Sequence, residues 1–237
     1  PNTYNLSKEE EKEEKENKLY TYLLYGTLPV QMAFLIFFFH AIQETNLSNS
    51  EIFGRIFGMG IMCGVIGINV GHELGHRNHR FAELIGEILL LTSLNTHFLP
   101  YHNGGHHYNV ATPKDAATAR KNEVLFVFWI RSHFTSYLQA WQLENKRMKS
   151  LNRHWLHHQN RMVVYTLCNV LLLALIYFTF GQFVLQTFIT AAIIGILLLE
   201  TVNYIEHYGL LRKKNNHGRY ERVKRNHSWN SNHKVGQ

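Results

Sequence analysis

Histidines gather in two short clusters of this sequence, which has 16 histidines among its 237 residues. The first cluster is GHELGH at residues 71–76, and the second is HNGGHH at residues 102–107. Both hold histidines four residues apart, and on an α-helix such residues share a face and can hold one metal ion between them. The last histidine of the second cluster points about 100° away from its neighbour, so it can serve a second ion. The expected ligands are His72, His76, His102, His106 and His107.

Two further motifs are less specific. NYIEHYG at residues 203–209 contains His207, and spacing alone leaves it open whether this histidine binds a metal or packs as an ordinary side chain. HWLHH at residues 154–158 stands among arginines just before an apolar run. Polar side chains that reach out of the membrane gather at such places. We therefore interpret its histidines as interfacial, with a metal role as the minority alternative; they are His154, His157 and His158.

A single helical histidine is usually a hydrogen-bonded core or surface residue. Two spaced clusters beside apolar runs favour metal binding instead, because ionisable groups at membrane depth are energetically costly and usually functional.

GHELGH also matches HExxH, the zinc-protease signature, in which Glu73 would be the general base. Carboxylates commonly fix the tautomer of ligating histidines. Glu73, Asp115 and Glu206 are the candidates, and the alternative for each is a surface or helix-terminal charge.

Long apolar runs must position these residues. Residues 19–43 and 162–199 contain no Asp, Glu, Lys or Arg, and about 20 helical residues cross a membrane. This pattern excludes a soluble single domain, a disordered chain and a disulfide scaffold; Cys63 and Cys168 lie in apolar stretches and are interpreted as packing residues. We predict an all-α, multi-pass transmembrane helix bundle that follows a polar, charged segment at residues 1–18. The predicted spans are residues 19–43, 56–71, 162–180 and 183–200, with the last two divided at Gly181.

Charge indicates the orientation of the bundle. Residues 44–51 lack Lys and Arg, whereas basic residues cluster just before residue 162 and after residue 209. The positive-inside rule therefore places both histidine clusters on the cytoplasmic side. The net charge of +7 is explained by this pattern, so we do not expect a nucleic-acid partner. Residues 81–101 are expected to form a buried or interfacial hairpin, and residues 124–142 an amphipathic segment at the headgroup boundary.

The motifs resemble one known family. HELGH, HNGGHH and NYIEHYGL, together with NVATPKDAATAR at residues 109–120 and HSWNSNH at residues 227–233, are similar to the integral-membrane alkane hydroxylases (alkane 1-monooxygenases) of the membrane fatty-acid desaturase and hydroxylase superfamily. This resemblance implies a multi-pass protein of the cell inner membrane that uses O2 and a rubredoxin-type electron donor with its reductase to hydroxylate the terminal carbon of alkanes. It implies two iron ions and adds His207 to the five ligands above, whereas His227 and His233 are not expected to bind iron.

The resemblance also suggests a partial chain. The sequence begins with Pro1 and ends before the third histidine motif of that family, so a fragment without the upstream helices and that motif, inactive by itself, is expected. Three other functions stay open at this point. They are a fatty-acid desaturase or lipid hydroxylase on the same scaffold, a membrane zinc protease, and a non-catalytic relative.

Overall fold

The structure, a computed structural model, describes residues 18–229, so the charged N-terminal segment and His233 lie outside the described residues. Within this range the chain is helical, and its extended pairing is limited to an isolated bridge between Lys214 and Tyr220. The expected all-α class is therefore confirmed for the described part of the chain. The elements are α2 (Lys18–Ala41), α3 (Asn49–Met62), the π-helix η1 (Cys63–Val70), α4 (Gly71–Gly75), α5 (Arg80–Leu91), α6 (Phe98–Tyr101), the π-helix η2 (His102–His106), α7 (His107–Asn109), α8 (Leu125–Ser150), α9 (Arg161–His207) and the 3-10 turn η3 (Arg225–His227).

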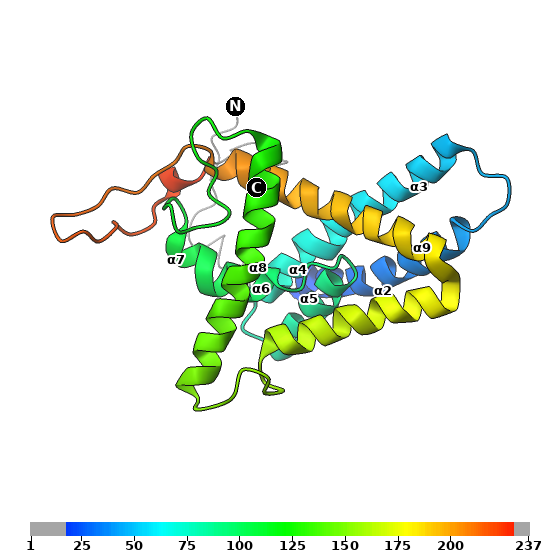
Figure 1. The fold of residues 1–237 in the computed structure, drawn as a ribbon, viewed down its shortest axis with the longest axis horizontal. Helices are drawn as coiled ribbons and strands as arrows, with labels where there is room; N and C mark the ends of the chain where they lie inside the picture. The colour runs from blue at the N-terminus through cyan, green and yellow to red at the C-terminus, as the bar shows by residue number, and fades with distance from the viewer. Residues whose placement is uncertain (1–17, 230–237) are drawn as a thin grey trace.

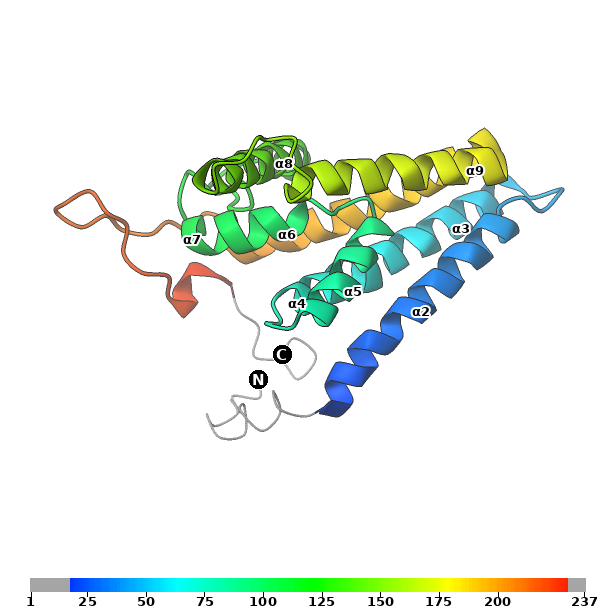
Figure 2. The same cartoon turned by 90° about the horizontal axis from the view of Figure 1, so that it is seen from below.

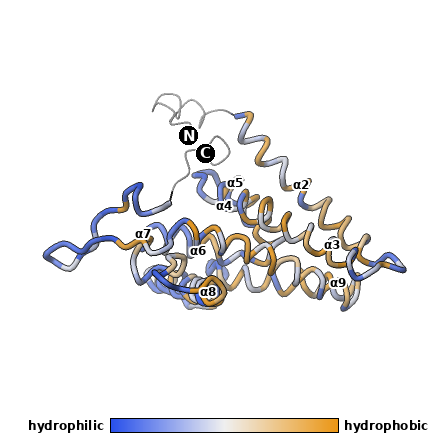
Figure 3. Tube along the Cα trace, turned by 90° about the horizontal axis from the view of Figure 1, so that it is seen from above, coloured by the Kyte–Doolittle hydropathy of each residue, from blue (hydrophilic) through white to orange (hydrophobic). Residues whose placement is uncertain are grey.

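Three helical stretches are long and apolar enough to cross a membrane. They are α2, the continuous stretch Asn49–Gly75 formed by α3, η1 and α4, and α9. Their outward side chains are exposed, with Phe37 at 68% and Phe178 at 84% of full exposure. Figure 3 shows hydrophobic residues along these helices and hydrophilic residues at the end that carries α7. Apolar side chains exposed over such lengths contact lipid, so the chain is an integral membrane protein.

α9 is a helical hairpin rather than one straight helix. Gly181 has a φ of 87°, in the left-handed region that favours glycine, and here the chain folds back (Figure 1). The sequence predicts the division at this residue. The returning arm packs closely on the second stretch, because a Cβ on Gly195 would lie 2.9 Å from the backbone nitrogen of Gly64. Small residues permit such close approach in membranes.

The hairpin at residues 80–101 enters the bundle without crossing it. α5 and α6 flank a buried polar turn at residues 92–97. Ser93 Oγ donates a hydrogen bond to the Cys63 carbonyl (3.0 Å), and Asn169 Nδ2 donates to Thr96 Oγ1 (3.0 Å). These bonds satisfy polar groups that would otherwise be costly in the membrane. The turn therefore anchors the hairpin, and α6 leads directly into the second histidine cluster.

α8 is longer than the amphipathic segment expected at residues 124–142, and it runs across the arms of α9 (Figure 1). Its first half exposes a row of apolar side chains that includes Phe126, Ile130 and Phe134, each at 64–65% exposure. A helix of this composition lies along the membrane surface. α4, η2 and the end of α9 come together at one end of the molecule (Figure 2), and they carry the two histidine clusters and His207.

Candidate metal centre

Three imidazole nitrogens converge on one point. The Nε2 atoms of His72 and His76 are 2.7 Å apart, those of His72 and His102 are 2.8 Å apart, and those of His76 and His102 are 3.1 Å apart. Nitrogens that bind one ion at about 2.1 Å lie about 3 Å from each other. Three neutral imidazoles at this spacing cannot all satisfy one another by hydrogen bonds, because each carries a single proton. The triangle therefore fits a metal ion.

His106 belongs to a second group. Its Nδ1 donates to Asp115 Oδ2 at 3.0 Å, which leaves the Nε2 lone pair free. Its ring centroid lies 5.1 Å from that of His207. The Nδ1 of His207 donates to the His227 carbonyl at 3.3 Å, so its Nε2 is free as well. A histidine that is anchored through one nitrogen and free at the other has the arrangement of a metal ligand.

His107 lies between the two groups. Its ring centroid is 4.5 Å from that of His102, 5.0 Å from that of His76 and 5.9 Å from that of His106. The structure thus brings together all six histidines that the sequence and the resemblance single out. Three of them form the Nε2 triangle, and the other three lie beside it.

His102 and His106 are stacked, with ring centroids 5.0 Å apart, as their four-residue spacing predicts, but their other contacts differ. His102 faces the first cluster, while His106, four residues later, faces Asp115 and His207. Residues 102–106 form a π-helix, whose hydrogen bonds join residues five apart. Single π-helical turns of this kind are frequent at functional sites.

Asp115 is the carboxylate that orients a histidine. It is buried, and besides His106 it accepts hydrogen bonds from Tyr101 Oη (2.6 Å) and Thr118 Oγ1 (2.7 Å). Burial acts to raise the pKa of Asp115, but the hydrogen bonds from His106, Thr118 and Tyr101 outweigh it and lower that pKa. The carboxylate is therefore ionised at neutral pH and keeps the His106 proton on Nδ1.

The other two candidate carboxylates are placed differently. Glu73 forms an ion pair with Arg77 at 3.2 Å, its side chain is about half exposed, and no hydrogen bond among the described residues joins it to a histidine. Such a position does not suit the general base of a zinc protease. Glu206 Oε2 lies 3.8 Å from the Nε2 of His207, beyond hydrogen-bond distance. Neither carboxylate has the contacts that Asp115 makes.

Burial favours the neutral form of three histidines of the cluster, His76, His102 and His107. It lowers the pKa of His102 well below the usual value, and the neighbouring histidines lower it further. It also lowers the pKa values of His76 and His107. Neutral imidazole is the form that binds metal, so these side chains are ready ligands at neutral pH.

Three residues at the site were not predicted from the sequence: Tyr101, Thr118 and Glu200. Tyr101 precedes the second cluster directly, and its hydroxyl both donates to Asp115 and accepts from the backbone nitrogen of Ala117 at 2.9 Å. Thr118 holds the same carboxylate from three residues away. Glu200 is a buried carboxyl group two turns before His207. The sole signal for Glu200 in the sequence is that it ends the uncharged run 162–199.

The HWLHH motif lies apart from the centre, in the exposed turn between α8 and α9. His154 Nδ1 accepts from the Leu156 backbone and His157 Nδ1 from the Gln159 backbone. No described contact links these rings to the histidines of the two groups. Their position agrees with the interfacial interpretation.

A membrane-embedded helical bundle with a histidine-rich metal-binding site at one end defines a class of membrane metalloprotein. Residues 52–237 match the model of the family described as "Fatty acid desaturase". The chain is 38% identical to the alkane 1-monooxygenase of Ectopseudomonas oleovorans over 222 residues, which are 94% of this chain and 55% of that protein. It is 35% identical to alkane 1-monooxygenase 1 of Alcanivorax borkumensis, over 92% of this chain and 54% of that protein. It is 23% identical to the xylene/toluene monooxygenase hydroxylase component XylM of Pseudomonas putida, over 87% and 55% respectively.

The chain therefore belongs to the fatty acid desaturase family, and it is similar to proteins named alkane 1-monooxygenase. It spans about half the length of the curated relatives it matches.

Proposed function

We propose that this chain carries the oxygen-activating centre of a membrane di-iron monooxygenase that hydroxylates the terminal carbon of alkanes. The observation that carries the proposal is the convergence of six histidines from three distant segments into two adjacent groups. Relatives named alkane 1-monooxygenase support the reaction and the alkane substrate. The overall reaction converts R–CH3, O2, two electrons and two protons into R–CH2OH and water.

In this proposal His72, His76 and His102 hold one iron ion, and His106 and His207 hold the second, with His107 completing the set between them. Imidazole suits iron because it is a neutral ligand of intermediate softness. The metal pair would supply the reduction of O2 and the oxidising power needed to break an unactivated C–H bond. The contribution of Asp115 is to hold the proton on Nδ1 of His106, so that Nε2 stays available.

An apolar wall stands on the membrane side of the histidines. Phe98 stacks on His102, with ring centroids 4.7 Å apart, and meets His72 edge-on at 5.5 Å. It packs in one cluster with Ile68 and Leu90, beside Ile196 and Leu199. An alkane offers no charge or dipole for recognition, so its binding must be hydrophobic. We propose that the alkyl chain reaches the centre from the bilayer along this wall, which also excludes water.

The electron donor is proposed to be a rubredoxin-type protein with its reductase, on the cytoplasmic face of the inner membrane. Positive-inside counting supports that face, because basic residues follow α9 beside the site. An electron donor in solution needs access to the same end of the bundle.

The test is iron content and octane turnover, with rubredoxin and its reductase supplied, by the chain extended at both ends to the length of its relatives, because these 237 residues alone are expected to be inactive. We expect alcohol as the product, and we expect His102→Ala to lose both iron and turnover. The double variant His157→Ala/His158→Ala is the matched control and keeps both. An alkene product would indicate the desaturase alternative, and a zinc-loaded protein would revive the protease. Loss of iron in the control variant would show that HWLHH supplies ligands.

A further inference from the structure

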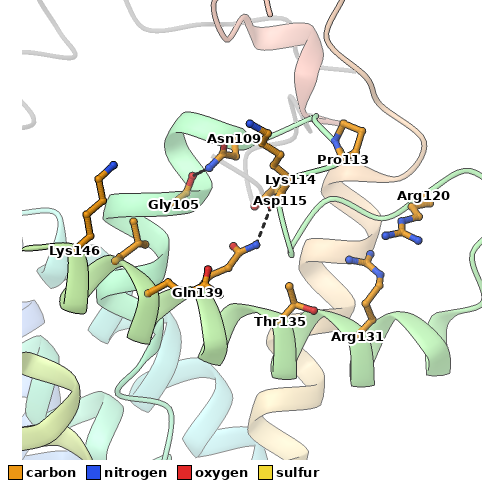
Figure 4. Close-up of a pocket in the computed structure, with 12 residues that line it drawn as sticks. Gly105, Asn109, Pro113, Lys114, Asp115, Arg120, Arg131, Thr135, Gln139 and Lys146 are labelled. Carbon is orange, nitrogen blue, oxygen red and sulfur yellow. Dashed lines mark hydrogen bonds between the residues drawn. The ribbon is translucent and has the colours of Figure 1, made fainter. Parts of the chain in front are cut away.

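A second polar site lies behind the histidines, on the far side of residues 102–115. A cavity of about 620 Å³ opens between α8 and the segment that contains Gly105, Asn109 and Asp115 (Figure 4). Most of the residues that line it are polar or basic. The proposed reaction, whose substrate is apolar, has no use for such a cavity.

The cavity holds cations without partners. Lys114, Arg120 and Lys146 line it, all three are exposed, and among the described residues none of their side chains forms an ion pair or a hydrogen bond. Figure 4 shows the three side chains standing around its rim. Cations gathered on one cavity without counter-charges repel one another and attract an anion.

The two carboxylates near the cavity, those of Asp115 and Glu123, already have other partners. Asp115, the sole acidic residue in the lining, is buried and holds His106, Tyr101 and Thr118. Glu123, which attracts Arg120 at longer range, is held by the fork of Arg131 at 2.6 and 2.9 Å. Arg131 itself also donates to two backbone carbonyls, and its guanidinium is thereby fixed in place at the cavity wall. The three rim cations therefore remain available for a ligand.

The cavity lies at the depth of lipid headgroups. α8 runs across the spans (Figure 1) and presents Phe126, Ile130 and Phe134 to the membrane. On a helix, Thr135, Gln139 and Lys146 fall on a different face from this apolar row, and that face lines the cavity. A surface helix places its apolar face in the acyl boundary and its polar face among the headgroups.

We propose that this cavity binds the phosphate headgroup of an anionic phospholipid. A phosphodiester offers one negative charge and two unesterified oxygens as partners for these cations, and basic pockets on the cytoplasmic side of membrane proteins, where the proposed orientation places this cavity, favour anionic headgroups. A zwitterionic headgroup fits less well, because its ammonium group would meet cations and no free carboxylate. The ligand class is therefore a glycerophosphate with an uncharged head alcohol, such as phosphatidylglycerol. The proposal does not rest on the alkane reaction, although Asp115 in the cavity wall also holds His106.

The experiment measures lipid enrichment around the whole protein. The chain is reconstituted in nanodiscs of equimolar phosphatidylethanolamine and phosphatidylglycerol, extracted in mild detergent, and its retained lipids are counted by native mass spectrometry. The triple variant K114Q/R120Q/K146Q should lose the preference for phosphatidylglycerol, by about fivefold for each cation removed. The control K149Q/K213Q/R222Q removes the same charge from exposed positions outside the cavity and should retain the preference.

Two further arms make the result decisive. The charge-preserving variant K114R/R120K/K146R should retain the lipid, and circular dichroism checks that every variant folds. Addition of inorganic phosphate distinguishes the source of the phosphate group. If inorganic phosphate displaces the retained lipid from the wild-type protein, the site is one for free phosphate and the lipid assignment is overturned. Equal loss of lipid in the control, or no loss in the triple variant, overturns the site itself.

Discussion

The proton on His106 is held by a single buried carboxylate, which makes Asp115 the most informative position at the scale of one residue. We expect Asp115→Asn to weaken metal binding by roughly 10- to 100-fold, because an amide can present its NH2 group to Nδ1 and so leave the wrong nitrogen free. Glu73→Gln is the control, since that side chain pairs with Arg77 on the surface. The measurement is a metal titration against a chelator of known affinity. Equal affinities in the two variants would show that Asp115 does not orient His106 for metal binding.

The sequence predicts which histidines gather, but it does not predict how they divide into two groups. The spacing of residues 72–76 and 102–107 is enough to predict a metal site, since few other roles explain so many neutral imidazoles. It cannot select Asp115 over Glu73 and Glu206, because that choice depends on which carboxylate is buried beside a ring nitrogen. The hydroxyl of Tyr101 is equally hidden from sequence, since its partner lies 14 residues away across a turn.

At the scale of elements, the spans and the turn of α9 follow from hydropathy and one glycine, whereas the two π-helical segments do not. A π-helix adds a residue to a turn without a composition of its own, so the sequence of η2 is indistinguishable from that of an ordinary helix. The hairpin at residues 80–101 is predictable because its glutamates and histidine forbid a full crossing. Its hydrogen bonds to α2, η1 and α9 are tertiary contacts that no local pattern contains.

The contact of α9 with the second stretch can be tested through Gly195. A methyl group there would lie 2.8 Å from Cys63 Cβ and 2.9 Å from the Gly64 nitrogen. We expect Gly195→Ala to lower the free energy of unfolding by about 1–3 kcal/mol, the usual cost of overpacking, and to weaken metal binding because His207 is on the same arm. Gly58→Ala meets open space and should stabilise α3 by up to about 1 kcal/mol. Thermal unfolding in detergent compares the two, and equal behaviour would mean that the helices are not in close contact.

The buried turn before α6 predicts a sensitivity to acid. Burial, with a smaller contribution from the adjacent His133, lowers the pKa of His97 to about 3, and Tyr137 packs against the same ring. His97 is neutral in the folded protein, whereas the unfolded chain binds a proton below about pH 6.5. Stability is therefore lost as the pH falls from about 6.5 towards 3.

Between pH 7.5 and pH 5 this single residue should remove about 2 kcal/mol from the free energy of unfolding. His97→Gln keeps a polar side chain that does not titrate. Its free energy of unfolding should therefore fall by about 2 kcal/mol less than that of the wild-type protein between pH 7.5 and pH 5. Chemical unfolding at both pH values measures the difference, because the contributions of all other histidines are shared by the two proteins. Parallel pH profiles would show that His97 is protonated in the folded state.

At the scale of the whole molecule, the loop after α2 and the hairpin at residues 208–224 lie at opposite ends (Figure 1). We expect Thr45→Cys to react with an impermeant thiol reagent from outside intact cells, and Asn216→Cys to react only after lysis. Both positions are exposed, and Cys168→Ser removes the less buried native thiol. Labelling of both cysteines from the same side would contradict the proposed orientation.

The way the histidines are distributed along the chain has a mechanical consequence. In the proposed assignment, the ion held by His72, His76 and His102 ties α4 to η2, and the ion held by His106 and His207 closes the loop of residues 107–206 and ties η2 to the end of α9. A metal cross-link that closes a long loop stabilises the folded state because it lowers the entropy of the unfolded chain. A metal site also contributes its binding free energy to folding. Trp229 donates hydrogen bonds to the backbone carbonyls of Glu206 and Tyr208, on either side of His207. Chelation should therefore act at a distance from the ligands: it frees the tail after α9 first, and residues 208–224 become the earliest site of protease cleavage.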